Sequence, residues 1–144
     1  MIWFLRHGDA EDTEPDSERR LTDKGERQAR EAGAALAAIG VEPELCLTSP
    51  KVRARDTALR ACEVLGVDVT IEPRLEGGDF DPLELAAGVD EILLVGHEPD
   101  FSNAIAALTG GRVDLKKGGI AGVEDRELRV LLRPKEIKAM GADR

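Results

Sequence analysis

The chain has 144 residues, of which 42% are hydrophobic and 34% charged, and a formal net charge of −9 at pH 7. This length fits one domain over residues 1–144 with a sizeable core. The negative charge argues against broad binding to nucleic acid or to an anionic membrane surface, so neither is an expected partner.

Several absences favour a cytoplasmic protein. No segment approaches the ~20 consecutive apolar residues of a membrane span, and no basic region precedes the apolar start as in a signal peptide. The two cysteines, Cys46 and Cys62, lack CxxC spacing. We expect buried, inert thiols rather than a disulfide, which suits a reducing compartment.

The first third of the chain predicts a strand, an acidic loop and a helix. Residues 2–5 are a continuous apolar run, typical of a strand buried on both faces. Residues 9–20 are acidic and polar and predict an exposed loop. Thr22 can cap a helix that ends at Gly40. The inward stripe of this helix has helical spacing and comprises Ala29, Ala32, Leu36 and Ile39.

The rest of the chain continues the alternation. A strand in "ELCLTSP" ends at Pro50, and a helix follows to about Leu65, with Pro50 in its first turn. "VDVTIEP" predicts a third strand, residues 81–87 a short helix, "EILLVG" a fourth strand and residues 100–108 another helix. A closing β-hairpin turns around Glu124–Arg126. The pattern predicts an α/β, three-layer fold: a mostly parallel sheet with helices on both faces.

Both histidines of the chain stand at predicted strand ends beside a glycine. His7 precedes Gly8, and His97 follows Gly96. A lone histidine is more often a satisfied core residue, but two in the same setting favour a shared site. Gly8 would allow a sharp turn, and ligands of such sheets bind beyond the carboxyl ends of the strands.

Arginines complete the candidate site. Arg6 precedes His7, and Arg53 lies one turn into a helix, where its side chain can reach back to the strand ends. Arg55 cannot share that face, and we expect Arg55 and Arg60 at the surface. Ser49 lies beside a helix N-terminus, which favours anions. Two guanidiniums and two imidazoles suit a phosphoryl group, whereas a metal fits poorly and no cofactor is expected.

The motifs "LRHGDA", "LTDKG", "SPKVRARDTA" and "VGHEPDFS" resemble the histidine phosphatase (phosphoglycerate mutase-like) superfamily, and in particular its small SixA-type branch. The resemblance spans residues 2 to about 103, with "LKKGGIAGVE" similar to a later strand. It implies a phosphoglycerate mutase-like fold and removal of phosphate from phosphohistidine on proteins. It also implies that His7 is the nucleophile, and that the phosphoryl oxygens are held by Arg6, Arg53 and His97.

The general acid departs from the family pattern. Many relatives carry a glutamate in a Leu-x-Glu stretch, whereas this chain reads Leu75-Glu76-Gly77. Candidates are Glu76, Asp79 and Asp81, and a solvated loop explains each equally well. A phosphohistidine substrate would lessen the need for an acid, since its P–N bond breaks readily once the imidazole is protonated.

Three functions remain open: a SixA-type protein phosphohistidine phosphatase, a phosphatase of small phosphate esters, and a phosphate-binding module without turnover. Short connections between the site residues leave only the loop at residues 9–20 as a lid. We therefore expect an open, shallow site that accepts a phosphorylated side chain of a protein partner. Because the loop is acidic, it should repel anionic metabolites and tolerate basic residues on that partner.

Overall fold

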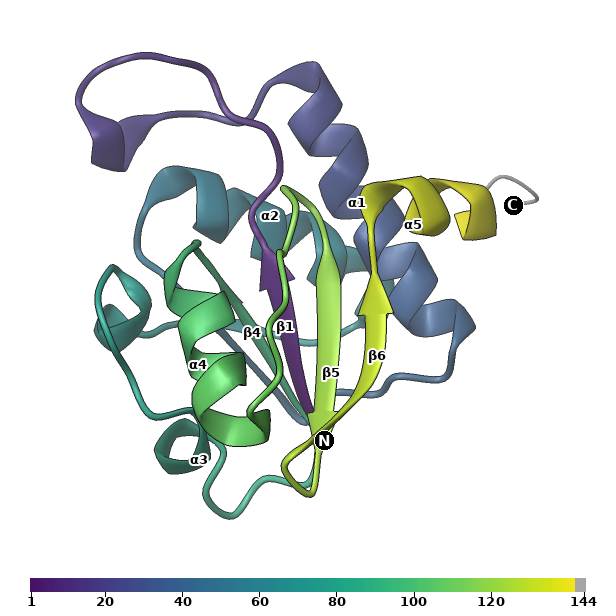
Figure 1. The fold of residues 1–144 in the computed structure, drawn as a ribbon. Helices are drawn as coiled ribbons and strands as arrows, with labels where there is room; N and C mark the ends of the chain where they lie inside the picture. The colour runs from purple at the N-terminus through teal and green to yellow at the C-terminus, as the bar shows by residue number, and fades with distance from the viewer. Residues whose placement is uncertain (142–144) are drawn as a thin grey trace.

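A computed structural model describes residues 1–141 of the chain. Its centre is a six-stranded sheet in the order β3-β2-β4-β1-β5-β6 (Figure 1). Strands β3, β2, β4 and β1 are mutually parallel, β5 runs antiparallel to β1, and β6 runs antiparallel to β5. The strands are β1 (Ile2–Arg6), β2 (Leu45–Thr48), β3 (Val69–Ile71), β4 (Ile92–Gly96), β5 (Ile120–Glu124) and β6 (Glu127–Leu132).

Helices cover both faces of this sheet and make three layers, as predicted. One face carries α1 (Asp23–Ala38), α2 (Val52–Leu65) and α5 (Pro134–Gly141), and the other carries α3 (Pro82–Leu85) and α4 (Asp100–Thr109) (Figure 1). Two single-turn 3₁₀ helices lie in loops, η1 (Asp16–Glu18) and η2 (Pro73–Leu75). No helix among the described residues is long and apolar enough to cross a membrane.

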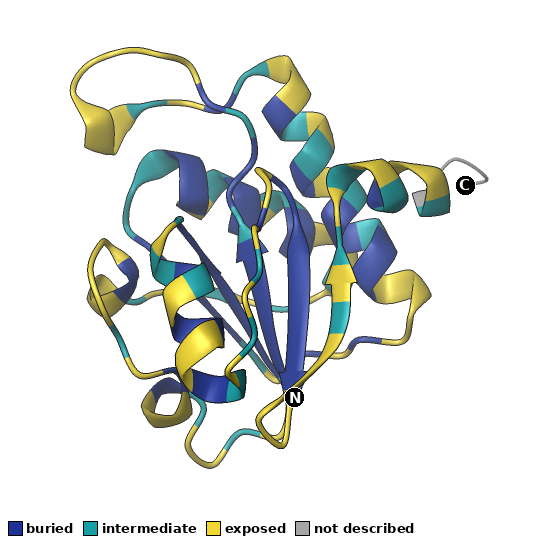
Figure 2. Cartoon of the chain, in the orientation of Figure 1, coloured by how far each residue is buried: buried dark blue, intermediate teal, exposed yellow. Residues whose placement is uncertain are grey.

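The central strands are buried on both faces because successive side chains point to opposite sides. Trp3 and Leu5 pack beneath α1 and α2, while Ile2 and Phe4 pack on the side of α4. There, the ring of Phe4 meets that of Phe101 edge to face, with centroids 5.3 Å apart. Figure 2 shows the buried strands enclosed by helices whose outer surfaces are exposed. This burial explains the continuous apolar runs of the sequence.

The predicted ends of α1 are confirmed. The Thr22 hydroxyl accepts the backbone N–H of Gly25 at 3.0 Å, which caps the first turn. Gly40, just beyond the helix, has a φ of +84°. The prediction that Ile39 belongs to the inward stripe is wrong, because Ile39 is the C-cap and its side chain is 43% exposed.

Three other details correct the sequence interpretation. Pro50 does not lie in the first turn of α2, because Lys51 is the N-cap and the helix begins at Val52. The helix expected over residues 81–87 is the shorter α3. Helix α5 was not foreseen, since the predicted hairpin extended to Pro134 and no element was assigned to the residues after it. The hairpin itself turns at Asp125 and Arg126, both with positive φ. The thiols of the two cysteines are buried and free, as expected.

Candidate active site

The candidate site lies where β1, β4 and β2 end side by side. Arg6 at the end of β1 is in register with Gly96 at the end of β4. The backbone N–H of His7 extends this ladder by donating to the Gly96 carbonyl at 3.0 Å. Likewise, the N–H of Ser49, just beyond β2, donates to the Val95 carbonyl at 3.0 Å. The first residues beyond three neighbouring parallel strands therefore share one edge of the sheet.

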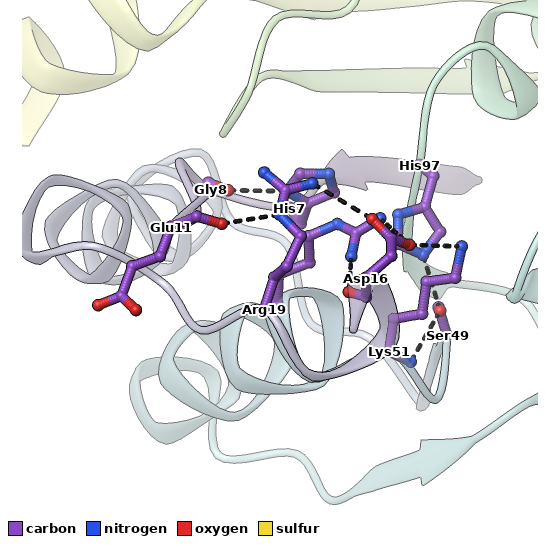
Figure 3. A network of polar contacts seen from close by, with 9 residues as sticks. His7, Gly8, Glu11, Asp16, Arg19, Ser49, Lys51 and His97 are labelled. Atoms are coloured by element: carbon purple, nitrogen blue, oxygen red, sulfur yellow. Dashed lines mark hydrogen bonds and ion pairs between the residues drawn. The ribbon is translucent and has the colours of Figure 1, made fainter. Parts of the chain in front are cut away.

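The two histidines face each other at this edge. Their ring centroids are 5.2 Å apart and their planes are inclined by 56°. The exposed fractions of His7 and His97 are 5% and 6%, and Arg53 is 7% exposed. Figure 3 shows the two rings close together, with Ser49 beneath His97. The structure thus brings together side chains that are about 90 residues apart in the sequence.

The hydrogen bond to Gly8 determines which nitrogen of His7 is free. The Nδ1 atom of His7 lies 2.7 Å from the Gly8 carbonyl oxygen. Because a carbonyl only accepts, Nδ1 carries the proton of the neutral ring and Nε2 keeps its lone pair. Burial, with the nearby charges of Arg53 and Arg6, lowers the pKa of His7 to about 4, although the bond to Gly8 opposes this shift. His7 is therefore neutral at pH 7 and has the free Nε2 lone pair that a nucleophile requires.

His97 is oriented by Ser49. The Nε2 atom of His97 lies 2.8 Å from the Ser49 hydroxyl, which itself accepts the backbone N–H of Lys51 at 3.1 Å. The hydroxyl proton is then free to be donated to Nε2, which leaves the ring proton on Nδ1. Burial, together with the charges of His7 and Arg53, lowers the pKa of His97 to about 3. A neutral His97 thus presents an N–H donor.

The two predicted arginines flank the histidines. The Arg6 Nη1 atom donates to the Leu115 carbonyl at 3.0 Å, and the Arg53 Nη1 atom to the Asp16 carbonyl at 2.8 Å. Three buried side-chain nitrogens lack a partner among the described residues, and all three belong to this site: Arg6 Nε, Arg53 Nε and His97 Nδ1. Buried donors are normally satisfied. A set of buried nitrogens without partners beside the free lone pair of His7 suits an anion with several oxygens, such as a phosphoryl group.

Thr57 ties the turn at His7 to helix α2, a link that the sequence interpretation missed. Its hydroxyl donates to the Arg53 carbonyl at 2.7 Å and accepts the backbone N–H of Gly8 at 3.0 Å. The sequence feature that could have indicated this link is the position of Thr57 one helical turn after Arg53, where its hydroxyl can reach the Arg53 carbonyl. Gly8 is required for a different reason than expected. It is not among the glycines with positive φ, but a Cβ on it would lie 2.6 Å from the Gly25 carbonyl oxygen.

The acidic loop, the one segment that the sequence left as a lid, contacts the site through Asp16. The Oδ2 atom of Asp16 lies 3.3 Å from Arg53 Nη2 and 3.5 Å from Lys51 Nζ. Burial alone would raise the pKa of Asp16, but these cations outweigh it and hold that pKa below its usual value. Arg19 braces the loop by donating to the Glu11 carbonyl at 2.7 Å (Figure 3). Asp16 was not predicted as a site residue, because residues 9–20 were interpreted as solvated.

The three candidate general acids, Glu76, Asp79 and Asp81, make no polar contact with the histidines within residues 1–141. Asp81 accepts the backbone N–H of Leu83 at 3.0 Å and caps α3. Glu76 and Asp79 are exposed. Within residues 1–141, no hydrogen bond or ion pair joins any of these three to either histidine. The predicted surface arginines pair with exposed or half-exposed carboxylates: Arg55 with Asp56, and Arg60 with Glu26 and Glu63.

The part of the chain described here contains no group of three or more His, Cys, Asp or Glu side chains that could hold a metal ion. The site instead provides guanidinium and imidazole groups, whose positive charge and N–H donors suit an oxyanion rather than a cation.

Comparison with known proteins identifies the family. The model of the histidine phosphatase superfamily (branch 1) matches residues 2–103. The chain belongs to the histidine phosphatase superfamily. An uncharacterized protein of Picosynechococcus sp. is 36% identical over an alignment of 159 residues, gaps included, that covers 93% of this chain and 96% of that one.

Solved structures agree with this assignment and with the predicted SixA-like resemblance. The protein histidine phosphatase SixA complexed with tungstate is 25% identical, with a TM-score of 0.82, over 95% of this chain and 99% of that one. A structure described as an α-ribazole-5′-phosphate phosphatase from Escherichia coli K-12 is 20% identical. It has a TM-score of 0.74 and covers 92% and 96% of the two chains. The phosphoglycerate mutase-like fold is confirmed, and membership of the superfamily supports phosphatase activity.

Proposed function

We propose that this histidine phosphatase superfamily member removes the phosphoryl group from phosphohistidine on a protein, with His7 as the nucleophile. The observation that carries the proposal is that the three buried side-chain nitrogens without a partner, Arg6 Nε, Arg53 Nε and His97 Nδ1, all belong to the site that holds His7 and its free Nε2. A phosphoryl group has three equatorial oxygens, and transfer requires mainly positioning and neutralisation of their charge. Arg6, Arg53 and His97 can supply both.

The reaction proceeds in two transfers. In the first, Nε2 of His7 attacks phosphorus, and the bond from phosphorus to the substrate nitrogen breaks, with the electron pair leaving on that nitrogen. In the second, water attacks phospho-His7 and the P–Nε2 bond breaks, with its electron pair returning to Nε2; both protons of water leave with the product as H₂PO₄⁻, which can lose one to solvent. The Gly8 carbonyl holds the Nδ1 proton throughout, which stabilises the positive charge of the phosphorylated ring.

Within residues 1–141 no carboxyl group hydrogen-bonds either histidine, and the Asp16 carboxylate over the site has a lowered pKa that makes it a poor proton donor; both observations favour phosphohistidine over an ester. An alkoxide leaving group needs a proton from an acid. The leaving imidazole of phosphohistidine needs none from the enzyme, provided that its other nitrogen is already protonated. The likeness to SixA, described as a protein histidine phosphatase, supports the same choice.

A turnover comparison tests the substrate. We expect the kcat/KM for a phosphohistidine-bearing protein domain to exceed that for sugar phosphates and nucleotides by at least tenfold. Selective turnover of one small ester would instead favour the alternative function. Turnover of neither class, with retained binding of inorganic phosphate, would indicate a phosphate-binding module.

Trapping the phosphoenzyme tests the role of His7. Rapid quenching without acid, followed by peptide mass spectrometry, should place the phosphoryl group on His7. The His7→Gln variant should give no phosphoenzyme while still binding inorganic phosphate in a ³¹P NMR titration, which shows that its site is folded. Phosphate trapped on His97 would contradict the assignment.

A further inference from the structure

A basic groove runs from the candidate site across α1 to α5, on the β5 side of β1. Its larger part has a volume of about 500 Å³ and is lined by Arg6 of the site itself. A smaller part of about 190 Å³ shares Gln28 and Pro134 with the first and continues along the two helices. Besides Arg6, the cations that line the basic groove are Lys24, Arg27, Lys116, Lys117, Arg133, Lys135 and Lys138, and they outnumber the two carboxylates of its lining, Asp9 and Glu31.

Most of this positive charge is not neutralised within the chain. Among residues 1–141, no ion pair or hydrogen bond engages the side chains of Lys24, Arg27, Lys135 and Lys138. Three other lining cations are paired: Lys116 with Asp114, Lys117 with Asp9 and Arg133 with Glu136. A concentration of free cations is unexpected in a chain of net charge −9. It creates a local field opposite to that of the molecule as a whole.

The backbone fixes one end of the basic groove against the catalytic histidine. The N–H of Gly118 lies 3.0 Å from the carbonyl oxygens of both Arg6 and His7. Gly118 has a φ of +79°, and a Cβ there would lie 3.1 Å from the Cβ of Gln28. The turn that carries Lys116 and Lys117 is therefore held between β1 and α1. When a phosphoryl group is bound at His7, the part of the molecule that adjoins this group lies beside Lys116 and Lys117.

We propose that the basic groove docks an acidic surface that flanks the phosphohistidine of a protein substrate. This inference rests on the proposed function and names the partner of the same site. The phosphoryl oxygens already have donors in the site, so the lysines are left for other anions. Lysine is a flexible point charge, which suits carboxylates spaced over a surface. Because the groove spans two helices and a loop, a small ester bound at His7 has no atoms that could reach its far end at Lys138.

The two sides of the site thus carry opposite charge. Asp16 and its acidic loop lie toward α2, and the basic groove lies toward α1 and α5. Complementary charge of this kind orients a partner and speeds its association, and salt weakens the effect. The expectation that the partner is basic therefore applies only to the side of the loop.

Three phosphohistidine peptides with glutamate, glutamine or lysine flanks provide the first test. At low salt, we expect kcat/KM to be about tenfold higher for the glutamate peptide than for the glutamine peptide. Lys24→Glu and Lys135→Glu should each reduce this preference about threefold. The control Arg126→Glu makes the same charge change at the opposite end of the sheet and should keep the preference. Equal kcat/KM values for the three peptides would overturn the proposal.

An NMR titration separates this inference from the proposed function. The unphosphorylated glutamate peptide should shift the backbone amides of the basic groove at residues 24, 27, 117 and 135, and the lysine peptide should not. If the chain cleaves no phosphohistidine peptide, the proposed function fails, and these shifts alone decide whether the groove binds acidic chains. If no shifts occur, or if inorganic pyrophosphate binds there more tightly than the glutamate peptide, the docking proposal is overturned.

Discussion

Glu98 and Arg6 both hydrogen-bond the backbone of Leu115, one at its N–H and the other at its carbonyl. The N–H of Leu115 donates to Glu98 Oε2 at 3.2 Å, and its carbonyl accepts Arg6 Nη1 at 3.0 Å. Ser102 fixes the Glu98 carboxylate, with its backbone N–H at 2.7 Å from Oε1. Since Glu98 follows His97 directly, this chain of contacts couples the end of β4 to the arginine at the end of β1.

Replacing Glu98 by Ala should therefore weaken catalysis through Arg6. Without the carboxylate, the Leu115 segment loses an anchor and Arg6 loses a fixed partner. We expect kcat/KM to fall about tenfold, which corresponds to one lost hydrogen bond. Glu98→Gln should restore part of the activity, because its single amide oxygen can still accept one of the two backbone N–H groups, that of Leu115 or that of Ser102. A melting temperature that falls while kcat/KM is unchanged would contradict this positioning role.

Ser49→Ala should remove the group that fixes the tautomer of His97. The ring could then rotate or carry its proton on Nε2, and the N–H directed at the phosphoryl group would be lost part of the time. We expect kcat to fall about tenfold with little change in KM. Ser49→Thr keeps the hydroxyl and serves as the control in the same steady-state assay. A loss confined to KM would mean that Ser49 only binds the ground state.

Arg53→Ala and Arg55→Ala form a matched pair on one helix. Arg53 is buried against the histidines, whereas Arg55 is exposed and pairs with Asp56. Loss of an electrostatic donor to the reacting group typically costs ~10²–10³ in kcat. We therefore expect a loss of that size for Arg53→Ala and less than a twofold change for Arg55→Ala. Similar losses for the two variants would show that Arg53 does not contact the phosphoryl group.

Asp16→Asn should strengthen anion binding. The Asp16 carboxylate lies beside Arg53 and Lys51 and competes with an incoming phosphoryl group for their charge. Because its side chain is about half exposed (54%), the effect is modest. We expect the inhibition constant for inorganic phosphate to fall about threefold. Glu18→Gln, on the same loop, is the control and should leave that constant unchanged. Weaker phosphate inhibition in Asp16→Asn would mean that the carboxylate supports binding instead.

The lowered pKa of His97 predicts a loss of stability in mild acid. The folded chain protonates His97 only near pH 3, while the unfolded chain does so near its ordinary value of 6.5. Below pH 6.5 the unfolded state therefore binds more protons, and stability falls as pH falls. At pH 5 the titration of His97 alone should lower the free energy of unfolding by roughly 2 kcal/mol relative to pH 7.5.

Urea unfolding of His97→Asn at the two pH values measures this term. Between pH 7.5 and pH 5, the free energy of unfolding of the variant should fall by about 2 kcal/mol less than that of the wild type. Arg55→Ala, which removes no buried imidazole, should retain the wild-type difference. Equal losses in all three proteins would show that His97 titrates near its ordinary pKa.

The layered fold was predictable because the buried strands are short apolar runs with clear ends. Thr22 and Gly40 mark the limits of α1, and both roles follow from local backbone chemistry. Helix α5 was missed because Arg133 and Pro134 suggested only the end of a strand. In the structure, Pro134 is the first residue of that helix, a position that favours proline.

The site was predictable where residues stand at strand ends. His7, His97 and Arg53 meet as expected because parallel strands end at one edge of the sheet. The contacts of Asp16, Thr57 and Glu98 were not predictable. Each of these contacts joins segments that are distant in the sequence, or depends on the geometry of a loop. In the sequence, none of the three residues stands out by type from the polar residues around it. Their positions depend on tertiary packing, which periodicity and capping do not encode.

The order of the sheet has a consequence for how the chain matures during synthesis. Strand β1 leaves the ribosome first, yet its neighbours are β4 and β5, made some 90 and 118 residues later. Until β5 emerges, β1 has at least one open edge, and Arg6 lacks the Leu115 carbonyl that fixes it. Such distant pairing slows folding. Strand β1 is thus translated long before its partners, and the nascent chain carries His7 for most of translation before β4 and β5 can complete the sheet edge around it.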